Sequence, residues 1–85
     1  MYYLYTELKL KHSFCVPDLG KVEGDVVLIS WLVDDGDHVD EGDEIVELET
    51  SKVTFSIESD KTGNIKLMKQ KGSSVKVGEE IAVIS

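Results

Sequence analysis

The stretch that decides the fold is Val46-Glu47-Leu48-Glu49-Thr50-Ser51-Lys52-Val53-Thr54-Phe55-Ser56-Ile57-Glu58, near the middle of the chain. Apolar and polar residues alternate on both sides of Ser51-Lys52, a pattern that predicts a β-hairpin with a two-residue tip. If Ser51 and Lys52 form the turn, Leu48 faces Phe55 on an apolar face, and we expect this pair to pack in the core beneath the tip. Glu47 and Glu49 then lie on the opposite, solvated face. Two-residue hairpin turns favour glycine-containing pairs because they need positive φ, so the Ser-Lys tip breaks the expected turn chemistry.

The size and charge of the chain narrow the classes of function. With 85 residues it forms a single small domain with a modest core. A net charge of −8 and the lack of arginine argue against nucleic-acid or anionic-membrane partners, and suit a basic protein partner or solubility alone. A single cysteine, no membrane-spanning run and no signal or transit pattern predict a cytoplasmic protein, or the mature form of a mitochondrial matrix protein.

Short segments rich in valine, isoleucine and leucine alternate with glycine turns along the chain, without a sustained helical period. This pattern predicts an all-β sandwich or barrel. The continuous apolar run Val26–Val33 predicts a well-buried strand. Residues 1–13 predict an extra strand or a partly ordered arm. The other expected strands are Glu44–Thr50, Val53–Glu58, Asn64–Gln70 and Glu80–Ser85.

An internal repeat indicates how the strands are organised. The segment Leu32–Glu49 superimposes on Met68–Ser85, and Ser59–Gly63 connects the two halves. Two copies of one β unit predict a pseudo-twofold fold in which each half covers the apolar face of the other. The matched pairs are Gly36 with Gly72, Val39 with Val75, Gly42 with Gly78, and Ile45 with Ile81.

Most candidate sites have a structural explanation. The acidic run Asp34–Glu44 lacks the spacing of an EF-hand loop and predicts solvated turns. His12 and His38 have no metal ligands at suitable spacing, and Cys15 lies in an apolar context that favours packing over reactivity. Lys52 remains. It is an ordinary solvated lysine or a modification site, and the broken turn chemistry around it favours the second interpretation.

Residues 14–84 resemble the lipoyl domains of 2-oxo acid dehydrogenase complexes, within the biotinyl/lipoyl attachment domain family. The resemblance is based on "FCVPDLG", "EGDVV", "WLVDDGDHVDEGDEIVELETSKVTFSIES" and "GNIKLMKQKGSSVKVGEEIAVI". It implies a flattened barrel of two four-stranded antiparallel sheets with pseudo-twofold symmetry, a barrel-sandwich hybrid. The domain would comprise residues 14–85, preceded by the arm over residues 1–13.

The resemblance also implies a function. Lys52 would carry lipoic acid through an amide bond, and Glu49, Thr50, Ser51 and Val53 would position the tip for a lipoate ligase or lipoyl transferase. The domain would be a monomeric swinging-arm carrier, not an enzyme, and part of or partner to a dihydrolipoamide acyltransferase. It would shuttle acyl groups and reducing equivalents between a thiamine-dependent 2-oxo acid (or acetoin) decarboxylase, the acyltransferase and dihydrolipoamide dehydrogenase.

Some features depart from the family pattern. Ser51 stands where many members have aspartate, a proline common before the second half is absent, and the longer stretch from Gly24 to Gly36 predicts a β-bulge. The end of the chain after the last strand suggests an excised domain or a free-standing carrier. Two alternatives remain: a biotinyl carrier that moves carboxyl groups, and an unmodified interaction module. Biotin carriers usually place their lysine between methionines, whereas here Ser51 and Val53 flank Lys52.

Overall fold

The structure is a computed structural model that describes residues 11–20 and 25–85, and all regular structure in these ranges is β-strand. The strands are β1 (His12–Cys15), β2 (Val26–Trp31), β3 (His38–Val39), β4 (Glu44–Glu49), β5 (Thr54–Glu58), β6 (Gly63–Leu67), β7 (Ser74–Val75) and β8 (Glu80–Ile84). The predicted all-β class is confirmed. The predicted arm ends after residue 13, whereas β1 begins at His12; the part of the arm over residues 1–10 lies outside the described residues.

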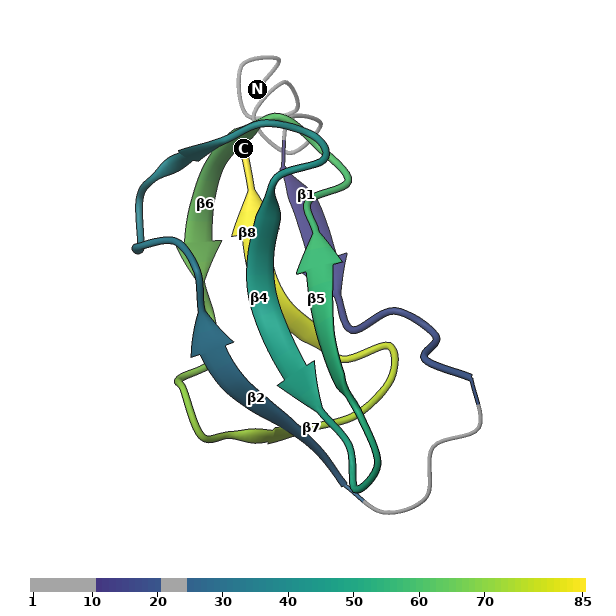
Figure 1. Cartoon of the computed structure of the whole chain (residues 1–85). Helices are drawn as coiled ribbons and strands as arrows, with labels where there is room; N and C mark the ends of the chain where they lie inside the picture. The colour runs from purple at the N-terminus through teal and green to yellow at the C-terminus, as the bar shows by residue number, and fades with distance from the viewer. Residues whose placement is uncertain (1–10, 21–24) are drawn as a thin grey trace.

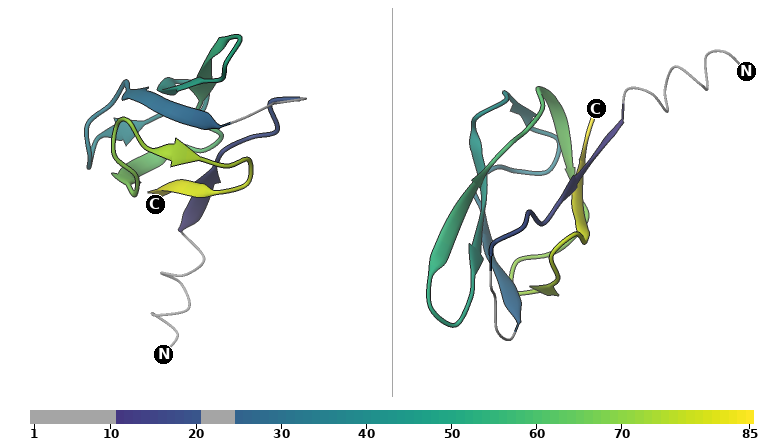
Figure 2. Two further views of the ribbon diagram at one scale, coloured as in Figure 1. Left: turned by 90° about the horizontal axis from the view of Figure 1, so that it is seen from below. Right: turned by 90° about the vertical axis from the view of Figure 1, so that its right-hand side faces the viewer.

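The strands form two four-stranded sheets with the orders β1-β8-β6-β3 and β5-β4-β2-β7. Every paired strand is antiparallel to its neighbour, and the sheets lie face to face as two layers (Figures 1 and 2). Exchanging β1 with β5, β8 with β4, β6 with β2 and β3 with β7 converts one order into the other. The expected pseudo-twofold, flattened barrel is therefore confirmed.

The repeated glycine turns follow the same symmetry. Gly36 and Gly72 have φ values of +91° and +92°, a left-handed conformation that side chains with a Cβ rarely adopt. The Gly36 N–H donates to the carbonyl of Ile65 at 2.7 Å, and the Gly72 N–H donates to the carbonyl of Leu28 at 2.7 Å. Each turn thus joins one half of the repeat to a central strand of the other half.

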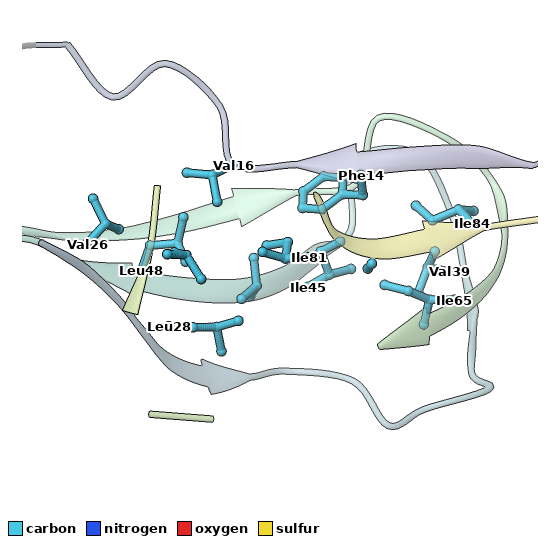
Figure 3. Close-up of a cluster of buried hydrophobic side chains, with 13 residues drawn as sticks. Phe14, Val16, Val26, Leu28, Val39, Ile45, Leu48, Ile65, Ile81 and Ile84 are labelled. Atoms are coloured by element: carbon cyan, nitrogen blue, oxygen red, sulfur yellow. The ribbon is translucent and has the colours of Figure 1, made fainter. Parts of the chain in front are cut away.

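The hydrophobic core fills the space between the two sheets (Figure 3). Equivalent positions of the two repeats both contribute to it, as Ile45 and Ile81 illustrate, since neither side chain is exposed. The core consists of Phe14, Val16, Val26, Leu28, Val39, Ile45, Val46, Leu48, Ile65, Val75, Ile81, Ala82 and Ile84.

Strand β2 is less buried than predicted, but it contains the predicted β-bulge. The run Val26–Val33 was predicted to be buried throughout, but the strand ends at Trp31, alternate residues are only half-buried, and Leu32 is 45% exposed. The reason is that one face of β2 packs on the core while the other faces outward. Its pairing with β4 shifts between Leu28 and Ser30, so Ile29 is the extra residue of a β-bulge. This is the bulge predicted between Gly24 and Gly36.

The β4–β5 hairpin has the predicted register. Leu48 pairs with Phe55, Glu47 with Ser56, and Glu49 with Thr54. However, Phe55 was expected to pack in the core with Leu48, and that expectation is wrong: Phe55 is half-buried and lies outside the core cluster. Strand β5 is at the edge of its sheet, so Phe55 has a strand neighbour on one side only.

An ion pair joins the end of β6 to the turn before β8. Lys69 Nζ lies 2.8 Å from Glu79 Oε2, and the Lys76 N–H donates to Glu79 Oε1 at 3.0 Å. The hydrogen bond from Lys69, followed by that from Lys76, lowers the pKa of Glu79 below its ordinary value of 4.5. The carboxylate therefore stabilises the folded state above that ordinary value, and this contribution is lost as the pH falls through the lowered pKa.

We expect Glu79→Gln to lower the melting temperature by about 1–3 °C at pH 7, a small effect because the pair is solvated. The difference from the parent protein should shrink progressively as the pH falls below 4.5, the ordinary pKa of Glu79. Thermal melts by circular dichroism between pH 7 and pH 3 measure this. The matched control is Glu58→Gln, because Glu58 makes no ion pair or side-chain hydrogen bond with the rest of the described chain. A destabilisation of Glu79→Gln that is independent of pH would contradict the assignment.

Candidate functional site

The tip of the β4–β5 hairpin lies at the end of the molecule opposite the C-terminus (Figure 1). Strand β4 ends at Glu49 and β5 begins at Thr54, so residues 50–53 form the connection. Ser51, Lys52 and Val53 are exposed, and Val53 is 50% exposed despite being apolar. The hairpin thus presents Lys52 to solvent from the end of two paired strands.

The tip closes without the positive φ angles that two-residue hairpins usually need. Among the described residues only glycines have positive φ, so Ser51 and Lys52 keep ordinary backbone conformations. The Thr50 N–H donates to the Val53 carbonyl at 2.8 Å. Thr50 Oγ1 accepts hydrogen bonds from the N–H groups of Lys52 and Val53, each at 3.2 Å. A threonine side chain therefore provides the closure that glycine would otherwise permit.

The structure brings the five predicted site residues together on this tip. A shallow, open concavity runs along it and is lined by Glu49, Thr50, Ser51, Lys52, Val53 and Thr54. Within residues 11–20 and 25–85, the Lys52 side chain forms no ion pair and no hydrogen bond. An exposed primary amine that has no carboxylate partner among the described residues suits a covalent attachment of an acid. Thr50 was predicted only as a residue that positions the tip for the modifying enzyme. The hydrogen bonds by which its hydroxyl closes the turn were not predicted, although a threonine directly before a tight turn is a known turn signal.

The remaining candidate groups have local roles. In the acidic run, Asp37 Oδ2 accepts from the Asp34 N–H and Asp43 Oδ2 from the Asp40 N–H, each at 2.9 Å, so these carboxylates close their own turns. His12 Nε2 lies 2.9 Å from the Asp60 carboxylate. In the described part of the chain, no three His, Cys, Asp or Glu side chains are grouped to hold a metal ion. That part also contains no helix long and apolar enough to cross a membrane.

Comparison with known proteins relates this geometry to one family. A family model, Biotin_lipoyl, with the description biotin-requiring enzyme, matches residues 12–84. A dihydrolipoyllysine-residue succinyltransferase component of the 2-oxoglutarate dehydrogenase complex from Staphylococcus saprophyticus is 40% identical over 70 residues, which are 81% of this chain and 16% of that protein. A dihydrolipoyllysine-residue acetyltransferase component of the pyruvate dehydrogenase complex from Pseudomonas aeruginosa is 42% identical over 67 residues, 78% of this chain and 12% of that protein.

A solved structure supports the same fold. The solution structure of the lipoyl domain of the 2-oxoglutarate dehydrogenase complex from Azotobacter vinelandii matches with a TM-score of 0.70 at 24% identity, over 86% of this chain and 94% of that one. At this identity the likeness concerns the fold. The chain spans less than a fifth of the length of the two acyltransferase relatives, so the similarity is confined to one domain of each.

Proposed function

The chain belongs to the biotin/lipoyl attachment family and has the fold of a lipoyl domain, and on this premise we propose that it carries lipoic acid in amide linkage to Lys52. The observation that supports this most directly is the exposed Lys52 amine at the tip of a regular hairpin, without a charged partner in the described residues. The two relatives compared above, which are acyltransferase components of 2-oxo acid dehydrogenase complexes, point to the same cofactor.

The proposed role of the protein in the chemistry is to orient and extend the cofactor. When bound, lipoic acid supplies a dithiolane that accepts acyl groups and reducing equivalents. In the attachment step a ligase would first join the carboxyl group of lipoate to the AMP part of ATP, with release of pyrophosphate. The Lys52 nitrogen would then form an amide bond with the carboxyl carbon, the bond from that carbon to AMP would break so that AMP leaves, and the amine would give up two protons to water. The step removes the positive charge of the amine. Strands β4 and β5 would then hold the backbone of Lys52 in place, while the lipoylated side chain moves through solvent.

We propose that the carrier operates within a 2-oxo acid dehydrogenase complex. Its partners would be a thiamine-dependent decarboxylase, an acyltransferase and dihydrolipoamide dehydrogenase, together with a lipoate ligase or lipoyl transferase. Tethering makes each transfer nearly intramolecular, which raises the effective concentration of the acyl group at the next active site. The net charge of −8 suits basic entrances to those sites. The proposed location is the cytoplasm or the mitochondrial matrix.

A biotinyl carrier is the second candidate, because the matching family is described as biotin-requiring. The residues that flank Lys52 argue against it, since Ser51 and Val53 occupy the positions where methionines would be expected. An unmodified interaction module of the same fold is the third.

Intact-mass spectrometry separates the three candidates. The chain is expressed with lipoate ligase and lipoate, and in parallel with biotin ligase and biotin. We expect complete addition of one lipoyl group, located on Lys52 by peptide mapping, and little or no addition of biotin. Preferential biotinylation would replace the proposal with the second candidate. An unmodified mass in both cultures would support the interaction module.

A further inference from the structure

We propose that Thr50 is the positioning residue of the lipoylation site, because its hydroxyl holds the backbone of Lys52 and so sets the direction of the amine. The inference rests on the proposed function at Lys52 and identifies the group that gives that site its geometry. Thr50 acts through Lys52 and does not itself react.

The hydrogen bonds around Thr50 use the full capacity of one hydroxyl. Oγ1 accepts from the N–H groups of Lys52 and Val53, at 3.2 Å each, and lies 3.3 Å from the Val53 carbonyl, to which it can donate. A threonine hydroxyl has one donor and two acceptor positions, so these three contacts occupy all of them. In the described residues no other side chain forms a hydrogen bond with the backbone of residues 51–53.

The choice of threonine explains how the tip remains ordered without glycine. A glycine pair would close the turn through positive φ and would leave the backbone free to sample several conformations. Thr50 is β-branched, so its χ1 angle is restricted, and it is half-buried beside the last residue of β4. A fixed hydroxyl bonded to the Lys52 N–H restrains the Cα–Cβ bond from which the lysine side chain starts.

Removing the hydroxyl should therefore affect the site and not the fold. Thr50→Val keeps the shape and branching of the side chain but leaves the N–H groups of Lys52 and Val53 to water, which reaches this exposed tip. The tip then occupies several conformations, of which a fraction suits the ligase. Since apparent affinity falls in proportion to the competent fraction, we expect the loss mainly in KM. We expect kcat/KM for lipoylation to fall about tenfold, within the range that modest misplacement of a reacting group produces.

The experiment compares Thr50→Val, Thr50→Ser and the control Ser56→Ala. Thr50→Ser retains the hydroxyl. Ser56→Ala removes a hydroxyl from the exposed face of the same hairpin, where it forms no side-chain hydrogen bond within the described part of the chain. Three quantities are measured: kcat and KM for lipoylation with purified ligase, lipoate and ATP; solvent exchange of the Lys52 and Val53 amide protons by NMR; and the melting temperature.

We expect Thr50→Val to lose most of its kcat/KM, exchange these two amide protons several-fold faster, and melt close to the parent. Thr50→Ser should recover kcat/KM to within about twofold of the parent, and Ser56→Ala should match the parent. If Thr50→Val is lipoylated as fast as the parent, or its two amides exchange at the parental rate, the role of Thr50 is wrong while the proposed function stands. A parent that the ligase does not modify overturns the proposed function, and the role of Thr50 with it.

Discussion

Exchanging the two residues of the tip, as Ser51→Lys with Lys52→Ser, is expected to abolish lipoylation in a domain that still folds. The swap conserves composition, charge and exposure, because both positions are exposed and neither side chain packs on the core. It does change the direction of the amine. The Lys52 N–H is bonded to Thr50 Oγ1, and no hydrogen bond of the described chain involves the N–H of Ser51, so the two positions differ in backbone geometry. A reacting group displaced in this way can lose a hundredfold or more in rate.

The measurement is intact mass after timed incubation with ligase, lipoate and ATP, with the fold checked by circular dichroism. Lys52→Arg is the matched control: it retains the positive charge and lacks an amine that can be acylated by the ligase, so it should remain unmodified. Full modification of the folded swap at residue 51 would show that the ligase requires only an exposed lysine. Modification of Lys52→Arg at another lysine would show that the site had been misassigned.

The hairpin and the repeat could be predicted from the sequence because both are local patterns. Alternation along residues 46–58 determined which side chains share a face, and the pairing of Leu48 with Phe55 followed from it. The glycines at Gly36 and Gly72 could be matched because the left-handed turns they occupy exclude most other residues. The stretch from Gly24 to Gly36 is longer than in the family pattern, and the extra residue, Ile29, forms the predicted β-bulge.

The degree of burial could not be predicted in the same way, because it depends on how segments distant in the sequence pack against one another. Periodicity places Phe55 on the inward face but does not tell that β5 is an edge strand. The run Val26–Val33 is almost continuously apolar, yet only Val26 and Leu28 are fully buried, while Trp31 and Val33 are partly buried against the core. Strand order arises from contacts between segments distant in sequence, and the alternation within one segment contains no information about them.

The candidate site was also predicted only in part from the sequence. Lys52 was found because it violated a local rule of turn chemistry, and such violations often mark functional positions. Thr50 was predicted to position the tip for the ligase, but its hydrogen bonds to the turn were not predicted, because the hairpin rule considers only φ angles. A side-chain hydroxyl that bonds to the backbone two and three residues later satisfies the same turn by another route.

The facing pair of Leu48 and Phe55 gives the second large prediction. Leu48 is wholly buried in β4, an inner strand, where it lies between Leu28 of β2 and Phe55 of β5. We expect Leu48→Ala to lower the free energy of unfolding by about 3–5 kcal/mol, since close neighbours on both sides prevent the cavity from collapsing. Phe55→Ala removes a larger side chain but should cost only about 1–2 kcal/mol, because the half-buried ring leaves a gap that is open to water.

This reversal of the usual size order tests the difference in burial between the two paired residues. An 85-residue domain is stabilised by roughly 4–13 kcal/mol in total, so Leu48→Ala is expected to be near the limit of folding, whereas Phe55→Ala remains folded. Urea unfolding followed by circular dichroism gives both free energies, and exposed Val53→Ala serves as the control with little change. Equal costs for the two substitutions, or a larger cost for Phe55→Ala, would show that Phe55 packs in the core, contrary to its half-buried position outside the core cluster.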